Sequence, residues 1–233
     1  GGGRILKVEV IKSIMKNSMG SNIIGTGLSG LVGSRIVELL AQEYSFEDLS
    51  RKTGVDITDK NQVLERIKNS SSPVVLHFAA KTDVDGAEDE KELAEKSMAW
   101  KINVEGTRNV VEACEQTGKK LLYVSTDMVF DGEKPLGEKY SEEDTPRPIN
   151  WYAITKYHGE QVVQKARVPW GIMRIAYPYR ANFEKKEYVW VFLSRLQNNQ
   201  EINAVADHYF TPTFIDDLGK VVAFFIKENY TGI

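Results

Sequence analysis

From residue 22 onward, short apolar runs alternate with longer stretches in which apolar and polar positions are mixed. An unbroken apolar run of about four to eight residues is typical of a strand buried on both faces, and apolar residues three and four positions apart are typical of a helix with one buried side. These patterns predict strands at Asn22–Gly25, Phe46–Leu49, Pro73–Ala79, Lys120–Ser125 and Gly171–Ala176. They predict helices at Leu31–Tyr44, Lys60–Lys68, Tyr152–Ala166, Tyr188–Gln197 and Ile215–Lys227, and one long helical pattern, continuous or interrupted, at Glu88–Gln116.

Strict alternation of strands and helices implies right-handed crossovers, which make the sheet parallel and place helices on both of its faces. The predicted fold class is therefore α/β, with a Rossmann-like doubly wound parallel sheet. Two loops rich in turn residues, Phe130–Asn150 and Tyr177–Lys186, follow predicted strands at their carboxyl ends. Ligands bind at that edge in sheets of this kind, so we expect both loops to face a binding site.

The two ends of the chain differ from this pattern. Residues 1–21 begin with three glycines and contain Met19-Gly20-Ser21, and we expect them to be an N-terminal extension or a cloning-derived segment outside the fold. At the other end, Gly232 and Ile233 follow a helical pattern as though a further strand began there.

Composition narrows the classes of function. The chain has 233 residues, of which 42% are hydrophobic and 27% charged, and its formal net charge is −3. A basic surplus for nucleic-acid binding is missing, and no apolar run approaches the roughly 20 residues that span a bilayer. A single cysteine, Cys114, fits a reducing compartment. We therefore expect a cytoplasmic globular protein with no nucleic-acid or membrane partner.

Glycines cluster between the first predicted strand and the first predicted helix, in the run GTGLSGLVG at residues 25–33. Glycine there permits a sharp turn and a close approach of the backbone to a pyrophosphate, which the helix N-terminus attracts. The spacing fits either Gly25, Gly27 and Gly30 or Gly27, Gly30 and Gly33, and the motifs farther along favour the second set. The run predicts a dinucleotide site.

Tyr152 and Lys156, in the sequence YAITK, lie four positions apart at the start of a predicted helix and therefore on one face. A free tyrosine has a pKa near ~10, and a nearby cation would lower it toward the working range. Upstream, a strand ends in Ser125, Thr126 and Asp127, which places a hydroxyl at the same sheet edge. This combination predicts proton transfer by Tyr152 to a substrate oxygen held by Thr126.

The segments STDMVFDG, at residues 125–132, and YSEEDTPRPINWYAITKYHGE, at residues 140–160, carry a resemblance to a known family. Over roughly residues 22–230 the chain is similar to the dTDP-4-dehydrorhamnose reductase family of extended short-chain dehydrogenases/reductases. The resemblance implies an NAD(P)-binding domain at residues 22–176 that carries the catalytic residues. It also implies a substrate-binding lobe at residues 177–233, shorter than in relatives and interleaved with the last sheet elements.

Carried over by position, the resemblance implies that Tyr152 is the proton donor, that Lys156 is its activating partner and a ribose ligand, and that Thr126 polarises the carbonyl. Asp127 and Tyr177 are the implied substrate contacts, and residues 207–213 (DHYFTPT) resemble part of the substrate side. The implied cofactor-binding residues are Gly27, Gly30, Leu31, Val32, Gly33, Asp56, Ile57, Ala79, Ala80, Lys81, Thr82 and Asn103, together with Tyr152 and Lys156.

The end of the second strand bears on the choice of cofactor. An acidic residue there would bind the adenosine 2′-hydroxyl of NAD, whereas an arginine accommodates the 2′-phosphate of NADP. The sequence at residues 49–52 is LSRK, so Arg51 favours NADP(H), with NAD(H) as the alternative. The histidines suggest no metal cluster, and we expect no metal because Tyr, Lys and Thr already stabilise the developing alkoxide.

The implied activity is reduction of a nucleotide-linked 4-keto-6-deoxy sugar, as in dTDP-L-rhamnose synthesis. Two alternatives stay open: a non-catalytic regulatory subunit resembling the β subunit of methionine adenosyltransferase, and a nucleotide-sugar epimerase or dehydratase on the same fold. A dehydratase would show an acidic pair after the catalytic hydroxyl, whereas here Asp127 is followed by Met128. Members of this fold often dimerise through two long helices, so we expect any homodimer to use Glu88–Gln116 and Tyr152–Ala166.

Overall fold

The computed structural model describes residues 21–181, 183, 187–205 and 207–233, so the expected extension at residues 1–20 lies outside the described residues. Within them, five strands form one parallel sheet in the order β2-β1-β3-β4-β5. The strands are β1 (Asn22–Thr26), β2 (Ser45–Leu49), β3 (Val74–His77), β4 (Lys120–Thr126) and β5 (Trp170–Ile175). The chain passes from β1 out to β2 and then crosses back to β3, so the winding direction reverses between β1 and β3. A Rossmann-like α/β fold is thereby confirmed, and its ligand-binding switch point lies where the glycine run follows β1.

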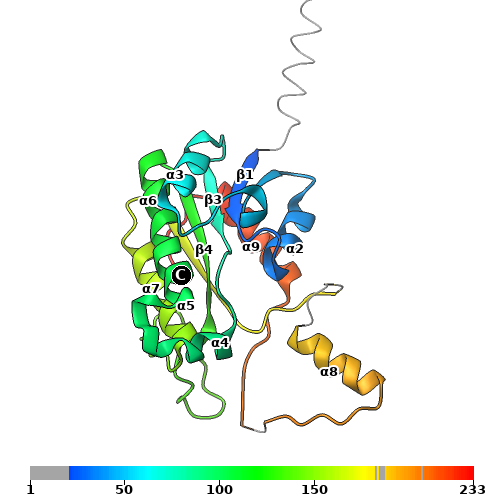
Figure 1. Cartoon of the computed structure of the whole chain (residues 1–233). Helices are drawn as coiled ribbons and strands as arrows, with labels where there is room; N and C mark the ends of the chain where they lie inside the picture. Colours follow the sequence, from blue (N-terminus) through cyan, green and yellow to red (C-terminus); the bar gives the residue numbers. More distant parts are fainter. Residues whose placement is uncertain (1–20, 182, 184–186, 206) are drawn as a thin grey trace, which may run out of the picture.

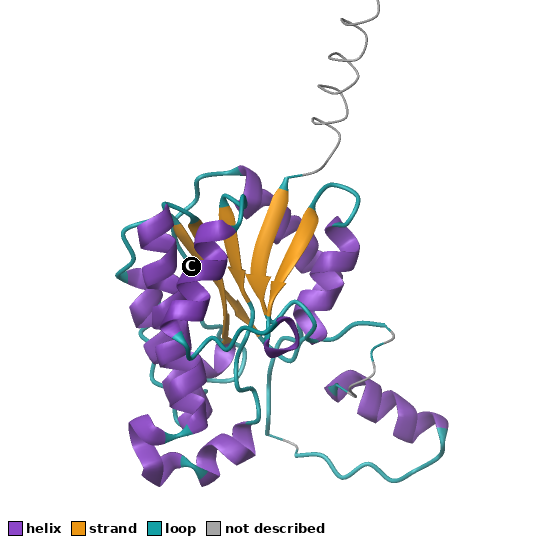
Figure 2. Cartoon of the chain, turned by 45° about the horizontal axis from the view of Figure 1, so that its top comes forward, coloured by secondary structure: helices purple, strands orange, loops and turns teal. Residues whose placement is uncertain are grey.

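Two layers of helices cover the sheet (Figure 1, Figure 2). The helices α2 (Leu31–Leu40) and α9 (Ile215–Lys227) pack together on one face, and α3 (Lys60–Asn69), α6 (Thr107–Thr117) and α7 (Trp151–Gln164) cover the other. Successive strand residues point to opposite faces. Ile23 therefore packs in the α2/α9 layer, whereas Ile24 packs in the α3/α6/α7 layer, and both are fully buried.

Local chemistry sets several element ends. Asp59 caps α3 by accepting hydrogen bonds from the amides of Asn61 and Gln62, and Asn150 caps α7 by accepting one from Ala153. The first helix ends at Leu40 rather than at Tyr44, because residues 41–43 form a turn into β2. The third strand is likewise shorter than predicted, since Phe78 and Ala79 already belong to the loop after β3.

The helical pattern predicted at Glu88–Gln116 is interrupted, and its continuous version is wrong. It comprises α4 (Val84–Asp89), the 3₁₀ segment η2 (Lys91–Lys96), α5 (Met98–Trp100), the π-helical segment η3 (Lys101–Gly106) and α6. The break lies at Ala94, whose φ of 46° and ψ of −123° are not helical.

The end of the described chain pairs with the outer edge of β5. Gly232 forms an isolated parallel bridge with Gly171, and its carbonyl accepts a hydrogen bond from the amide of Ile172 at 3.0 Å, which is the strand-like pairing that the sequence suggests. The predicted helix α8 (Tyr188–Gln197) has no buried residue and stands apart from the sheet in both views (Figure 1, Figure 2).

Candidate active site

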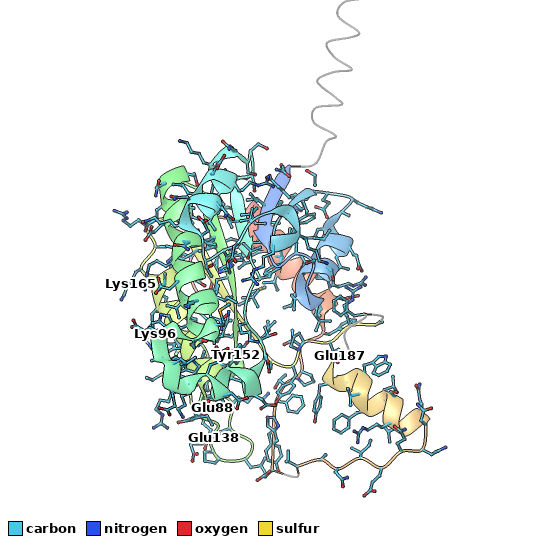
Figure 3. The ribbon with its side chains drawn as sticks, viewed as in Figure 1. Glu88, Lys96, Glu138, Tyr152, Lys165 and Glu187 are labelled. Carbon is cyan, nitrogen blue, oxygen red and sulfur yellow. The ribbon has the colours of Figure 1, made fainter. Side chains whose placement is uncertain are left out.

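A cavity of about 840 Å³ opens at the carboxyl ends of the strands, between the glycine turn and Tyr152. Every candidate site residue from the sequence lines it except Lys81 and Asn103. Figure 3 shows Tyr152 on α7 and Glu187 at the start of α8, and both contribute to the cavity wall. The structure therefore brings together residues from Gly27 to Glu187 around one cavity.

The glycine turn forms one end of the cavity as a cradle of bare backbone. Gly27 has a φ of +68°, and a Cβ on it would lie 2.6 Å from the amide nitrogen of Ala79. A Cβ on Gly33 would lie 2.3 Å from the carbonyl oxygen of Gly27. Gly30 is the N-cap of α2 and supplies no side-chain cap, so the first amides of this helix have no capping side chain. This arrangement suits the pyrophosphate of a dinucleotide.

The end of β2 lies beside this cradle. Ser50, Arg51 and Lys52 line the cavity at the start of the 3₁₀ turn η1 (Arg51–Thr53). The Arg51 guanidinium forms an ion pair with Asp56, with Nη2 and Oδ2 3.0 Å apart, and its side chain is 66% exposed. Hydrogen bonds from Thr58 and the charge of Arg51 lower the pKa of Asp56. Two candidate cofactor residues thus contact each other at this end of the cavity.

Tyr152 and Thr126 meet at the other end. Tyr152 is 9% exposed, and burial raises its pKa to about 12, although a hydrogen-bond interaction with the Thr126 hydroxyl opposes the shift. Thr126 caps the 3₁₀ turn η4 (Asp127–Val129) by accepting a hydrogen bond from the amide of Met128 at 3.2 Å. The phenol therefore keeps its proton at neutral pH in this structure.

Lys156 lies buried beneath the site, one helical turn after Tyr152. Its ammonium donates a hydrogen bond to the carbonyl of Val124 at 2.8 Å and lies 4.0 Å from the centre of the Tyr123 ring. Burial lowers its pKa to about 7, and the charge of Glu160 opposes that change. The sequence suggested that Lys156 would lower the pKa of Tyr152. In the structure the cost of burying both charges dominates, so the two pKa values move apart.

A second cavity, of about 1050 Å³, adjoins the first and shares Asp127, Met128, Ile175 and Tyr177 with it. Burial raises the pKa of Asp127. The two candidate substrate residues, Asp127 and Tyr177, thus lie where the cavities meet, and part of the DHYFTPT segment lines the second cavity.

Tyr177 has an unusual backbone for a side-chain-bearing residue, with a φ of +40°. Its ring centre lies 4.2 Å from that of Phe210, 5.2 Å from that of Tyr188 and 5.5 Å from that of His208. The strained conformation aims an aromatic ring between the end of β5, α8 and residues 207–213.

Lys81 and Asn103, for which the resemblance implies a role as cofactor ligands, do not line the cavity. The buried Asn103 amide instead accepts a hydrogen bond from the Lys81 backbone amide at 2.8 Å and donates one to the Thr155 hydroxyl at 2.9 Å. Asn103 therefore links the loop after β3 to α7. Its position in the π-helical segment, which periodicity does not reveal, turns the side chain inward.

Sequence reasoning missed several lining residues, including Phe78, Ile102 and Pro178. Phe183 and Glu187 also reach the cavity, and no motif marks them because only the path of the chain after β5 brings them there. Ser29 could have been found, since it lies inside the glycine run.

Metal binding and membrane insertion can be judged for the part of the chain that the structure describes. Within those residues, no group of three or more His, Cys, Asp or Glu side chains is placed to hold a metal ion. No described helix is both long enough and apolar enough to cross a bilayer.

Comparison with known proteins agrees with this geometry. The family model described as the RmlD substrate binding domain matches residues 21–232. The chain is 31% identical over 202 residues to a dTDP-4-dehydrorhamnose reductase of Mycobacterium tuberculosis, a match that covers 86% of this chain and 64% of the relative. It therefore spans less than two thirds of that relative's length.

Two further matches place the chain in the same group. A dTDP-4-dehydrorhamnose reductase of Bacillus anthracis, solved in complex with NADP, superposes with a TM-score of 0.81 at 34% identity, over 92% of this chain and 73% of that one. The methionine adenosyltransferase 2 subunit beta of Pongo abelii is 29% identical over 95% of this chain and 65% of the relative. The family match over nearly the whole described chain, together with the cavity that gathers its motifs, shows that the chain belongs to the RmlD substrate binding domain family.

Proposed function

We propose that the protein is an NADP(H)-dependent reductase of a nucleotide-linked 4-keto-6-deoxy sugar, with dTDP-4-dehydrorhamnose as substrate and dTDP-L-rhamnose as product. One observation carries the proposal: the glycine cradle and the buried Thr126–Tyr152 hydroxyl pair face a single cavity. The similarity to dTDP-4-dehydrorhamnose reductases supports the choice of substrate class.

In the proposed reaction, the cofactor supplies the hydride and the side chains at the Tyr152 end of the cavity supply the proton. When bound, a reduced nicotinamide supplies the hydride that the ketone carbon accepts. The Thr126 hydroxyl donates a hydrogen bond to the ketone oxygen, and Tyr152 passes its proton to that oxygen as the carbon–oxygen double bond becomes single. The resulting phenolate recovers a proton from solvent. A protonated Lys156 nearby stabilises the phenolate by its charge.

The same cavity has residues suited to hold the cofactor. Gly27, Gly30 and Gly33 leave room for the pyrophosphate beside the amides of α2. Arg51 and Lys52 at the end of β2 supply positive charge for a 2′-phosphate, so we favour NADP(H) over NAD(H). Lys156 would bind the nicotinamide ribose, and Asp127 and Tyr177 would contact the sugar at the junction of the two cavities.

We also propose a cytoplasmic location and a homodimer that uses the segments 84–117 and 151–164. The stacked rings of Trp100 and Trp151, 6.0 Å apart, join these segments, and Leu93 and Met98 are exposed on them. We retain residues 22–176 as the cofactor domain and residues 177–233 as part of a substrate lobe.

The direct test is purified protein with NADPH and dTDP-4-keto-6-deoxy-mannose, followed by the nicotinamide absorbance. We expect turnover, with a loss of at least ~100-fold in Tyr152→Phe because the variant lacks the proton donor. NADPH binding, measured by fluorescence, should weaken by no more than about threefold in the same variant, because the phenol is one of many expected cofactor contacts. Tight NADPH binding with no turnover of any keto sugar would overturn the proposal.

A regulatory subunit is the second candidate, because the match to the methionine adenosyltransferase subunit covers 95% of this chain. That reading predicts NADPH binding, no keto-sugar turnover, and tight association with a partner enzyme. Measuring turnover and partner binding on one preparation separates the two candidates.

A further inference from the structure

We propose that His77 is a positioning residue that fixes the loop 78–82, one wall of the cofactor cavity, against the helix that carries Tyr152 and Lys156. It does so as a neutral ring with its proton on Nε2, within a continuous chain of buried hydrogen bonds. The inference rests on the proposed function in one respect, that the loop faces a nicotinamide cofactor.

The imidazole bridges two hydroxyl groups from different elements. His77 is the last residue of β3 and is fully buried. Its Nδ1 lies 2.7 Å from the Thr26 hydroxyl at the end of β1, and its Nε2 lies 3.0 Å from the Thr107 hydroxyl at the start of α6. The ring therefore spans the sheet and the helical layer above it.

The neighbouring bonds fix the direction of each hydrogen bond. The Thr107 hydroxyl donates to the Asn103 carbonyl at 2.7 Å, so it accepts from Nε2–H of His77. Because the Thr107 bond places the ring proton on Nε2, Nδ1 is an acceptor, and the Thr26 hydroxyl donates to it while accepting from the amide of Ala79 at 3.2 Å. The Thr107 end sets the tautomer, and the bonds at the Thr26 end agree with it. With the proton on Nδ1, Thr26 would have no acceptor at the ring.

The chain of bonds ends on the catalytic helix. Asn103 accepts from the Lys81 amide, donates to the Lys81 carbonyl at 3.2 Å and donates to the Thr155 hydroxyl. Thr155 in turn donates to the Tyr152 carbonyl at 2.8 Å. The loop is thus fixed at two points. Ala79 is bonded to Thr26, which His77 orients, and Lys81 is bonded to Asn103. Both connections continue through Asn103 to Thr155 in α7.

The ring must be neutral for this role, because it acts as donor on one side and acceptor on the other. Burial, together with the charge of Lys156, lowers the pKa of His77 to about 3. The aromatic ring of Tyr123 lies 5.4 Å from it, centre to centre. A phenylalanine or leucine of similar size could fill the space, but the Thr26 hydroxyl would lose the ring acceptor for its proton and the Thr107 hydroxyl would lose the ring donor.

Thr107 offers the cleanest test, since it touches neither cavity. We expect Thr107→Val to weaken NADPH binding about tenfold, because a buried bond that orients the loop is lost. Thr107→Ser keeps the hydroxyl and should bind NADPH within about twofold of wild type. Thr117→Val is the matched control: Thr117 lies in the same helix and makes the same kind of bond, to the Ala113 carbonyl at 2.7 Å, far from the site.

A spectroscopic measurement tests the tautomer independently of binding. In protein labelled with ¹⁵N-histidine, with His77 identified by comparison with His77→Asn, Nδ1 should be unprotonated and Nε2 protonated from pH 5 to pH 8. The opposite tautomer, or titration of the ring in this range, would overturn the proposal, as would unchanged NADPH affinity in Thr107→Val. If NADPH binding responds as expected and no keto sugar is reduced, the proposed function fails and the role of His77 stands.

Discussion

Arg174 in β5 and Glu160 in α7 form a buried bidentate ion pair. The Arg174 Nε lies 3.0 Å from Oε1 of Glu160, and the Arg174 Nη2 lies 2.7 Å from Oε2. The Glu160 side chain is fully buried and that of Arg174 is 9% exposed. Glu160 lies one helical turn beyond Lys156, and its charge raises the pKa of that lysine. The pair therefore joins α7, which carries Tyr152 and Lys156, to β5, whose last residue, Ile175, lines both cavities.

Breaking this pair should destabilise the fold strongly. We expect Glu160→Gln to lower the free energy of unfolding by about 3–5 kcal/mol, because the largely buried Arg174 side chain keeps its charge and loses its carboxylate partner. The double variant Glu160→Leu with Arg174→Met removes both charges and should lose much less. Urea unfolding of the two variants beside wild type decides the matter. Equal losses in both would contradict the expectation.

Gly27 and Gly118 form a natural pair for testing the cradle. Both are left-handed, with φ of +68° and +67°, but a Cβ on Gly27 would strike the Ala79 backbone, whereas nothing lies within 4 Å of a Cβ on Gly118. Gly118→Ala should cost about 1–2 kcal/mol from the backbone conformation alone. Gly27→Ala should cost more and should also abolish NADPH binding, since the loop after β3 must move. Similar losses of stability with intact binding in both variants would show that the close approach is unimportant.

Cofactor choice should depend on Arg51. We expect Arg51→Ala to weaken NADPH binding about tenfold or more, because a charge-assisted contact with the 2′-phosphate is lost. NADH affinity should stay within about twofold, since NADH has no such phosphate. Arg167→Ala serves as the control, because Arg167 also forms a surface ion pair, with Glu115, and does not line the cavity. Equal effects on both cofactors would count against this role.

The pH dependence of catalysis should reflect Lys156. Its pKa is lowered from 10.5 to about 7 by burial, so it carries its charge below that pH and loses it as the pH rises through about 7. Because the charge stabilises the Tyr152 phenolate, kcat/KM should fall above about pH 7. Lys156→Met should be slow throughout and should lack this step. A wild-type profile that stays flat from pH 6 to pH 9 would rule out this protonation state as the active one.

Periodicity located nearly all the regular elements, because buried parallel strands such as β3 are apolar at all positions but the last and helices such as α9 keep one apolar side. It could not locate the break at Ala94 or the π-helical turn around Asn103. A π-turn adds one residue to a helical turn and changes which side chains face inward without changing composition.

The glycine run, the LSRK segment and residues 125–127 were visible because each stands at the end of a strand, and parallel strand ends converge. Tyr152 and Lys156 were visible instead by their spacing on one face of a helix. The protonation states of the side chains in the site were harder to predict. The spacing of Tyr152 and Lys156 suggested a lowered tyrosine pKa, but the depth of burial, which raises it to about 12, depends on the whole fold. The role of His77 was equally hidden, since its partners Thr26 and Thr107 are remote in sequence.

At Tyr177 we expect the requirements of thermal stability and of substrate binding to differ. A side chain at a φ of +40° costs of order 1–3 kcal/mol, which glycine would largely recover. Glycine or asparagine, however, would remove the ring that contacts Phe210 at the junction of the two cavities. In a library randomised at this position, selection for heat resistance alone should enrich glycine or asparagine, whereas selection for sugar reduction should return tyrosine. At this position we therefore expect a gain in thermal stability to come at the expense of sugar reduction.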